Sequence, residues 1–297
     1  MKQLDNNFGI IVSVYNKTGM VELSNGDQEH FLTKSNKIKP VVGDNVLYER
    51  LDEKTFLITE ILESRSQLMR LNTRGQPQVI ASNLTQILLI TAPQPTPNLF
   101  LIDQFILISE LMNCALSIIS NKIDITDENH HSLRIYEELG YRLVKISAKY
   151  ETNLNHLINL LNHQTTILLG QSGVGKSTIT NLLIGNNLNK TDILSTKTKK
   201  GRHTTSAITM HRILENGYLI DTPGIENLRP NVSDIKEIEN GFREINSVSE
   251  HCKFRNCIHI NEPDCAIKKA LKQGKITIKR YENYKKLIAE FEIPLSF

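Results

Sequence analysis

The pattern of hydrophobic and polar positions changes character twice along this chain of 297 residues. In the first part, turn-forming sequences separate five short stretches in which apolar and polar side chains alternate: FGIIVSVYN, GMVELSN, EHFLT, DNVLYER and TFLITEIL. Alternation with a period of two predicts β-strands, and five strands without a helix are typical of a small closed barrel. We therefore expect an OB-like barrel over residues 1–66, followed by a polar connector, SRSQLMRLNTRGQPQ.

From about Asn83 onward, apolar runs alternate with segments of helical spacing. The predicted strands are TQILLITA, CALSIIS, YRLVKIS and TTILLG, and the predicted helices between and after them are NLFLIDQFILISELM, LRIYEELG, NLNHLINLLN and STITNLLIG. Such alternation predicts a parallel sheet with helices on both faces, whose ligands lie beyond the carboxyl ends of the strands. We expect this α/β domain to cover residues 67–227.

After YLIDTPGI the pattern becomes helical through VSDIKEIENGFREI, and a cysteine-rich segment and a basic tail follow. We expect residues 228–297 to form a small helical domain. The predicted fold class is therefore a multidomain chain with a β barrel, a central α/β domain and a small C-terminal helical domain.

Charge and composition change this picture little. The net charge of +3 does not by itself indicate a nucleic-acid partner. One basic run covers residues 197–202, and a second comprises Lys268, Lys269, Lys272, Lys275, Lys279, Arg280, Lys285 and Lys286. Either run alone is equally consistent with solvated surface.

The start of the chain lacks the layout of a signal peptide, and no apolar run reaches the length of a membrane span. We expect a cytoplasmic protein. Four cysteines in that compartment favour metal-binding or core roles over disulfides, and Cys114 in CALSIIS is expected to be a core residue.

The segment GQSGVGKS fits the phosphate-binding pattern G-x4-G-K-[ST], between an apolar strand and a helix. Glycines let backbone N–H groups surround a phosphate, and the helix N-terminus adds a favourable dipole. Lys176 is expected to neutralise the β- and γ-phosphates, and Ser177 to bind Mg²⁺. The predicted contact residues are Gly170, Gln171, Ser172, Gly173, Val174, Gly175, Lys176, Ser177 and Thr178.

Two further strand ends carry a candidate base reader. In NKID, Asp124 can accept hydrogen bonds from N1–H and the exocyclic amine of guanine, a donor pair that adenine lacks. Asn121 would bridge toward the base and the neighbouring loop, and the stem of Lys122 would pack on the base. The next strand ends in SAK, which comprises Ser147, Ala148 and Lys149. Together the two elements favour guanine, and a P-loop ATPase or kinase is the alternative.

The segment LIDTPG fits the pattern D-x-x-G after a strand. Asp221 would hold Mg²⁺ through water, and the Gly224 N–H would sense the γ-phosphate. Upstream, Thr205 is our first choice for an Mg²⁺ ligand when GTP is bound, with Thr204 as the alternate. Many GTPases carry a water-orienting glutamine directly after D-x-x-G, but here the residue is Ile225, which cannot polarise water.

That replacement predicts slow intrinsic hydrolysis unless another group orients the water. His203, beside the switch threonines, is the candidate catalytic residue, and a solvated loop histidine is the alternative.

A cluster near the C-terminus has metal-ligand spacing. Cys252, Cys257, His259 and Cys265 lie within fourteen residues. Three thiolates and one imidazole suit tetrahedral Zn²⁺ and leave no open position, so the metal would be structural. Because the segment has little apolar content, we expect zinc to supply much of its folding energy. Reduced free thiols or a redox pair are the alternatives.

With these motifs in place, the chain resembles the circularly permuted bacterial family called ribosome small subunit-dependent GTPase A. The resemblance covers the barrel, the series NKID–SAK–P-loop–GRHTT–DTPG, and C-x4-C-x-H-x5-C. It implies a GTP hydrolase that acts as a late assembly factor of the small ribosomal subunit, binds that subunit and its rRNA, and is stimulated by it. It also implies a hydrolytic role for His203. Ser206 departs from the family's GRHTTT, which leaves the choice of threonine open.

The permuted order places DTPG directly before the C-terminal domain, and we hypothesise that movement at Gly224 reaches that domain through IENLRP. We expect a monomer with one zinc ion, and Mg²⁺ bound with GTP. A second function class remains open, in which the chain is a GTP-sensing rRNA scaffold whose hydrolysis is incidental.

Overall fold

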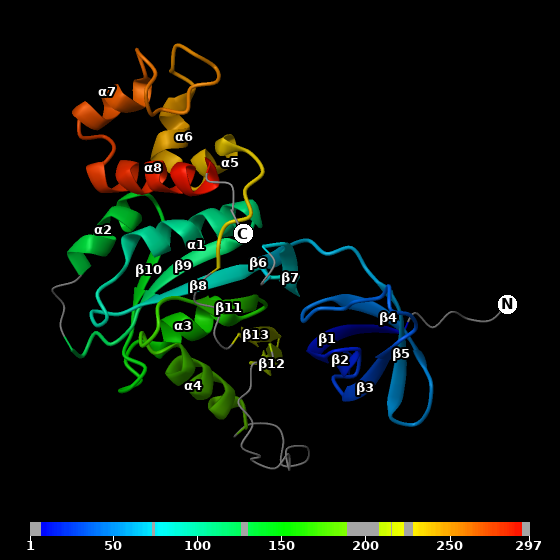
Figure 1. Ribbon diagram of the computed structural model, residues 1–297. Coiled ribbons are helices and arrows are strands. Elements are labelled where there is room, and N and C mark those ends of the chain that lie inside the picture. Colours follow the sequence, from blue (N-terminus) through cyan, green and yellow to red (C-terminus); the bar gives the residue numbers. More distant parts are fainter. Residues whose placement is uncertain are drawn as a thin grey trace.

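The computed structural model describes residues 7–72, 75–125, 130–188, 208–214, 216–222 and 228–292 (Figure 1). A small barrel lies on one side of a central sheet, and the helices of the C-terminal part lie above helix α1. Among the residues described, no helix combines the length and the apolar content needed to cross a bilayer.

The five strands predicted for the first part of the chain are all present. They are β1 (Phe8–Tyr15), β2 (Thr18–Leu23), β3 (Gln28–Thr33), β4 (Asn45–Arg50) and β5 (Thr55–Ile61). Their order is β1-β2-β3-β5-β4, and β4 pairs back with β1, so the barrel is closed. Its centre is filled by the alternating side chains that point inward, among them Ile11, Val21, Phe31, Val46 and Ile58. The predicted OB-like barrel is confirmed.

The segment predicted as a connector instead contains two strands, β6 (Gln67–Leu71) and β7 (Pro77–Ser82), which pair with each other. The connector prediction is wrong because the polar residues of this segment hide a few apolar positions that become fully buried, such as Leu68 and Ala81. The pair also holds the barrel, since the Ser82 hydroxyl donates to Asp44 at 2.5 Å.

The central sheet contains β8 (Gln86–Thr91), β9 (Ala115–Ser120), β10 (Arg142–Lys145), β11 (Thr165–Leu169), β12 (Thr209–Ile213) and β13 (Gly217–Asp221). The order is β10-β9-β8-β11-β13-β12. The four strands predicted from apolar runs and β13 are parallel, but β12 is antiparallel to β13 and was not predicted. Its sequence, TMHRI, is too short and too polar to stand out.

Helices cover both faces of this sheet (Figure 1). On one face lie α1 (Leu99–Leu111) and α2 (His130–Glu138), and on the other lie α3 (Leu154–Leu161) and α4 (Lys176–Leu188). Alternate residues of β8 serve the two cores: Ile87 and Leu89 pack under α1, whereas Leu88 and Ile90 pack under α3 and α4. A strand buried on both faces reads as an unbroken apolar run.

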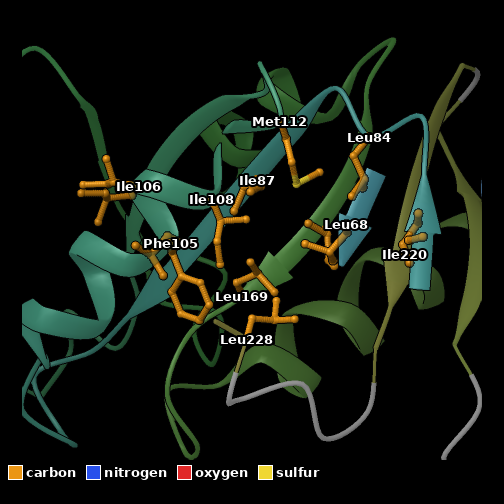
Figure 2. Packing of buried hydrophobic residues seen from close by; sticks show 14 of the residues in the cluster. Leu68, Leu84, Ile87, Phe105, Ile106, Ile108, Met112, Leu169, Ile220 and Leu228 are labelled. Atoms are coloured by element: carbon orange, nitrogen blue, oxygen red, sulfur yellow. The ribbon is translucent and has the colours of Figure 1, made fainter. Parts of the chain in front are cut away.

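Figure 2 shows the core under α1, where Phe105 and Ile108 of α1 lie near Leu169 of β11 and Leu228. Leu228 is the first residue described after the D-x-x-G segment, and it is 2% exposed. The start of the chain that leads to the C-terminal domain is therefore anchored in the core of the central domain.

The C-terminal part consists of α5 (Ile235–Asn240), α6 (Arg243–Ser249), α7 (Ala266–Lys272) and α8 (Ile278–Glu292). A capping box starts α5, with Asp234 and Glu237 each satisfying a backbone N–H of the other's position. These helices share an apolar core that includes Phe242 and Tyr284 and takes in Leu107 of α1. These helices therefore supply an apolar core to the domain, and the expectation that zinc supplies much of the folding energy of the cysteine-rich segment stays a prediction.

One member of the basic tail is not on the surface. Arg280 is 1% exposed. It donates to Asp103 of α1 at 2.6 Å and to both carboxylate oxygens of Glu244 in α6, at 2.7 and 3.0 Å. Asn283 and Tyr136 donate the remaining bonds to Asp103. Burial raises the pKa of the Asp103 carboxyl, and the charge of Arg280 offsets part of that rise.

We expect Arg280→Met to lower the free energy of unfolding by about 3–5 kcal/mol, because it leaves two buried carboxylates without their cation. Urea unfolding followed by circular dichroism measures this. Lys279→Met is the matched control, since the Lys279 side chain is 58% exposed and its pair with Glu282 lies on the surface. Equal unfolding midpoints for the two variants would contradict the expectation.

Candidate nucleotide site and metal centre

The sequence motifs meet at one edge of the central sheet. NKID follows β9, SAK follows β10, the glycine-rich loop follows β11, and Asp221 ends β13. These four strands are parallel, so their carboxyl ends lie at the same edge. The antiparallel strand β12 begins there as well, with Thr209 opposite Asp221. Motifs that are out of the usual order along the chain are thus neighbours in space.

The glycine-rich loop has a backbone that other residues adopt only with strain. Gly170, Gly173 and Gly175 have φ angles of +141°, +77° and +98°. A Cβ at Gly170 would collide with the Ile90 carbonyl, and one at Gly175 with the amide of Asn121. Glycine at these positions therefore allows both the turn and the close approach of the neighbouring strand ends.

The rest of the loop presents polar groups. Val174 is fully buried and fixes the loop to the core under α4, whereas Ser172, Ser177 and Thr178 are exposed. Lys176, the first residue of α4, donates through Nζ to the carbonyls of Gly170 and Gln171 at 2.7 and 2.8 Å. A positive charge at a helix N-terminus beside this loop makes an anion-binding site suited to phosphates.

Asn121 joins the loops that follow three different strands. Its Nδ2 donates to the Val174 carbonyl at 3.0 Å, and its Oδ1 accepts from the Ala148 N–H at 3.0 Å. Asn121 is 2% exposed, so these bonds are shielded from water. The bridge toward the neighbouring loop that the sequence suggested is therefore present, and it connects NKID to both SAK and the glycine-rich loop.

Lys122 and Asp124 are also held in place. Lys122 donates through Nζ to the carbonyls of Gly173 at 2.6 Å and Gln94 at 3.0 Å, which stretches its stem across the front of the loop. Asp124 accepts from the Ser147 hydroxyl at 2.5 Å. The ammonium of Lys149 lies 4.7 Å from the ring of Tyr150. The carboxylate predicted to read the base is thus held by the SAK loop.

The structure brings together every predicted contact residue of NKID, SAK and the glycine-rich loop, and it places Asp221 on the adjoining strand end. The roles of these residues in binding GTP stay predictions. His203, Thr204, Thr205, Ser206, Gly224 and Ile225 lie outside the described residues.

Sequence reasoning missed a contact between the glycine-rich loop and α1. The side chain of Gln171 accepts from the Asn98 N–H at 2.9 Å, and Asn98 caps α1 by accepting from the N–H groups of Phe100 and Leu101. An asparagine before an apolar helical pattern is a signal for the cap. No local signal indicates its contact with a loop more than seventy residues later.

The four predicted metal ligands form a compact cluster. The ligand atoms of Cys252, Cys257, His259 and Cys265 all lie within 4.8 Å of one another. All four cysteines of the chain are free thiols. The sulfurs of Cys252 and Cys265 are 3.9 Å apart, and each is 3.5 Å from Nδ1 of His259.

These separations fit a metal rather than a disulfide. Tetrahedral zinc with bonds of about 2.3 Å to sulfur and about 2.0 Å to nitrogen places sulfurs about 3.8 Å apart and sulfur and nitrogen about 3.5 Å apart. The cluster therefore has the donor set and the spacing for a closed, structural zinc site.

The loop that carries His259 is also supported from outside the cluster. Glu262 accepts from the N–H groups of Ile258, Ile260 and Asn261 at 2.7, 2.9 and 3.0 Å, and Tyr281 donates to the His259 carbonyl at 2.7 Å. Burial raises the pKa of Glu262, but these backbone bonds outweigh it and the net shift is downward. The sequence analysis did not predict this support. Its only local signal is an acidic residue, Glu262, between the predicted ligands His259 and Cys265.

A phosphate loop that opens a helix, a base reader joined to it and a strand-ending aspartate are the parts of a guanine-nucleotide site. Here the base reader precedes the phosphate loop along the chain. The fold and the site therefore define the class of circularly permuted GTPases.

Comparison with known proteins narrows this class. The profile of the family described as RsgA GTPase matches residues 61–231. A protein named Small ribosomal subunit biogenesis GTPase RsgA from Actinobacillus succinogenes is 34% identical over 290 residues, covering 95% of this chain and 83% of that protein. A protein of the same name from Haemophilus influenzae is 32% identical over 289 residues, covering 94% of this chain and 84% of that protein.

Solved structures agree. YjeQ from Thermotoga maritima superposes with a TM-score of 0.75 at 27% identity, covering 96% of this chain and 98% of YjeQ. YloQ, a circularly permuted GTPase, superposes with a TM-score of 0.74 at 25% identity, covering 98% and 96%. The chain belongs to the RsgA GTPase family, and it is a GTPase.

We expect Asn121→Ala to weaken both GTP and GDP binding by about 10- to 100-fold. The Val174 carbonyl and the Ala148 N–H lose their shared partner, and leaving a buried polar group without a hydrogen bond costs about 1–3 kcal/mol. Titration with a fluorescent guanine nucleotide measures this. Asn155→Ala, at an exposed position of α3, is the control. Wild-type affinity in the Asn121 variant would show that the bridge is dispensable.

Proposed function

We propose that this chain acts as a late maturation factor of the small ribosomal subunit, and that the subunit stimulates its hydrolysis of GTP. The relatives reported above are named as small ribosomal subunit biogenesis GTPases. The observation that carries the proposal is the bridge through Asn121, because it joins the guanine-reading loops to the phosphate loop in one preorganised site.

In this proposal each strand end has a task. Asp124, fixed by Ser147, reads the guanine edge, and Lys176 neutralises the phosphates. Ser177 and Thr205 are the proposed Mg²⁺ ligands, with Asp221 reaching the ion through water. Magnesium would offset the charge that develops on the phosphate oxygens as the bond to the γ-phosphate breaks.

The proposal assigns the orientation of water to His203, because Ile225 occupies the position where a glutamine commonly performs it. The Gly224 N–H senses the γ-phosphate. Slow hydrolysis by the free chain and fast hydrolysis on the ribosomal subunit are then expected together, since the subunit can place His203 beside the attacking water.

The partner side of the proposal rests on two surfaces. Six lysines of the C-terminal basic run are exposed: Lys269, Lys272, Lys275, Lys279, Lys285 and Lys286. The barrel is of a type that often binds nucleic acid. We propose that the chain is a cytoplasmic monomer that binds rRNA. It would consist of a barrel (1–66), a GTPase domain (67–227) and a C-terminal domain (228–297) that holds a structural zinc ion.

We expect purified small ribosomal subunits to raise the GTPase rate by on the order of 10³-fold, as activating partners do for GTPases with an incomplete site of their own. His203→Ala should keep GTP affinity but lose the stimulated rate. His156→Ala, at an exposed position of α3, is the control. Phosphate release over a titration of subunits measures both, and an unstimulated wild-type rate would favour the scaffold function instead.

We expect Asp124→Asn to shift preference from guanine to xanthine nucleotides, because the new amide donates where the carboxylate accepts. Competition between GTP and XTP for the variant and the wild type measures the shift. Unchanged GTP affinity, or ATP competing as well as GTP, would refute the assignment of Asp124.

A further inference from the structure

The imidazole of His259 lies between the cysteine cluster and a buried carboxylate. Nδ1 faces the cluster, 3.5 Å from the sulfurs of Cys252 and Cys265. Nε2 faces away from it, 3.3 Å from Oε1 of Glu239. Both residues are buried, at 1% and 5% exposure, so neither polar group can rely on water.

Metal binding fixes where the proton of this ring must be. A metal at the centre of the four ligand atoms takes the lone pair of Nδ1, so Nε2 carries the hydrogen and becomes a donor that must be satisfied. Nε2 has no partner of good hydrogen-bond geometry within the described part of the chain. Glu239 already lies within ion-pair distance of Nε2.

We propose that Glu239 is a positioning residue of the metal centre. Its carboxylate accepts a hydrogen bond from the Nε2–H group of His259 and thereby selects the tautomer that binds metal through Nδ1. This inference rests on the proposed zinc ion. Carboxylates commonly play this part behind histidine ligands, where they fix the ring and increase its basicity.

The position of Glu239 is itself well defined. It lies on α5, whose N-terminus is held by the capping box of Asp234 and Glu237. The preceding residue, Ile238, is 1% exposed in the core shared with α8 and α1. The carboxylate therefore reaches the metal loop from a helix that is fixed independently of the metal, twenty residues earlier in the chain.

The contact has a structural consequence for the domain. The ligand cluster otherwise lies in one local segment, residues 252–265, supported by Glu262 and by tyrosines of α8. Glu239 adds a bond from α5, the helix nearest along the chain to the D-x-x-G segment. The metal centre thus links α5 to the 252–265 segment across the domain.

The test measures zinc affinity in the full-length protein by competition with a chromogenic chelator. Glu239→Ala should raise the dissociation constant by about 10- to 100-fold, and Glu239→Gln by less, because its amide oxygen still accepts the proton. Glu250→Gln should leave the dissociation constant unchanged. Glu250 is an exposed carboxylate that lines a surface hollow beside the cluster, as Glu239 also does. Wild-type affinity in both Glu239 variants would overturn the proposal.

A second readout requires no variant. Long-range ¹H–¹⁵N spectra of the zinc-loaded wild-type protein should show His259 bound through Nδ1 and protonated at Nε2, and binding through Nε2 would overturn the proposal. If Glu239→Ala does not fold, the glutamine variant and this spectrum decide. A wild-type protein that holds no zinc refutes the metal centre itself, whereas zinc held equally well by all variants refutes only the role of Glu239.

Discussion

The buried guanidinium of Arg280 is the constraint on which the arrangement of the molecule depends. It neutralises Asp103 of α1 and Glu244 of α6 at once, and it lies 4.2 Å from the ring of Phe242. A buried ion pair adds little to stability compared with apolar side chains, but each of its charges is costly once its partner moves away. Helices α1, α6 and α8 can therefore shift only together, and the C-terminal domain is held against the central domain in one position.

Helix α1 connects this network to the nucleotide site. Its cap, Asn98, donates to Gln171 of the phosphate loop, and Asp103 follows little more than one turn later. The same helix packs on Leu228, where the chain leaves the D-x-x-G segment. The sequence suggested that GTP controls the C-terminal domain through the covalent link after Gly224. The structure adds a second connection, from the phosphate loop through Gln171 and Asn98 to α1. The covalent link also contacts α1, through Leu228, so we infer that a shift of the link would act on the helix that contacts Arg280.

Local patterns allowed much of the fold and the site to be predicted from the sequence. Barrel strands follow from alternation, buried strands from apolar runs, and the glycine-rich loop and the candidate metal ligands from spacing within a few residues. The strand β12 and the β6–β7 pair were missed because their sequences are short or polar, although each pairs with a strand nearby in the chain. The burial of Arg280 and the approach of Glu239 to His259 could not be predicted, because each depends on partners outside the local pattern. A lysine or arginine in a basic run has the same local pattern whether it faces water or two buried carboxylates.

The permuted order also explains why the two appended domains hold different parts of the nucleotide domain. The barrel joins the sheet at β12 through the pair Ser13 and Thr209, and its buried Glu22 accepts from the Tyr218 hydroxyl of β13 at 2.5 Å. These two strands flank the segments expected to respond to the γ-phosphate. The C-terminal domain instead holds α1, on the far side of β11 and β8. We infer that a rearrangement of β12 and β13 would act on the barrel directly, whereas within the described residues it would reach the C-terminal domain through the sheet and neighbours such as Leu228 and α1.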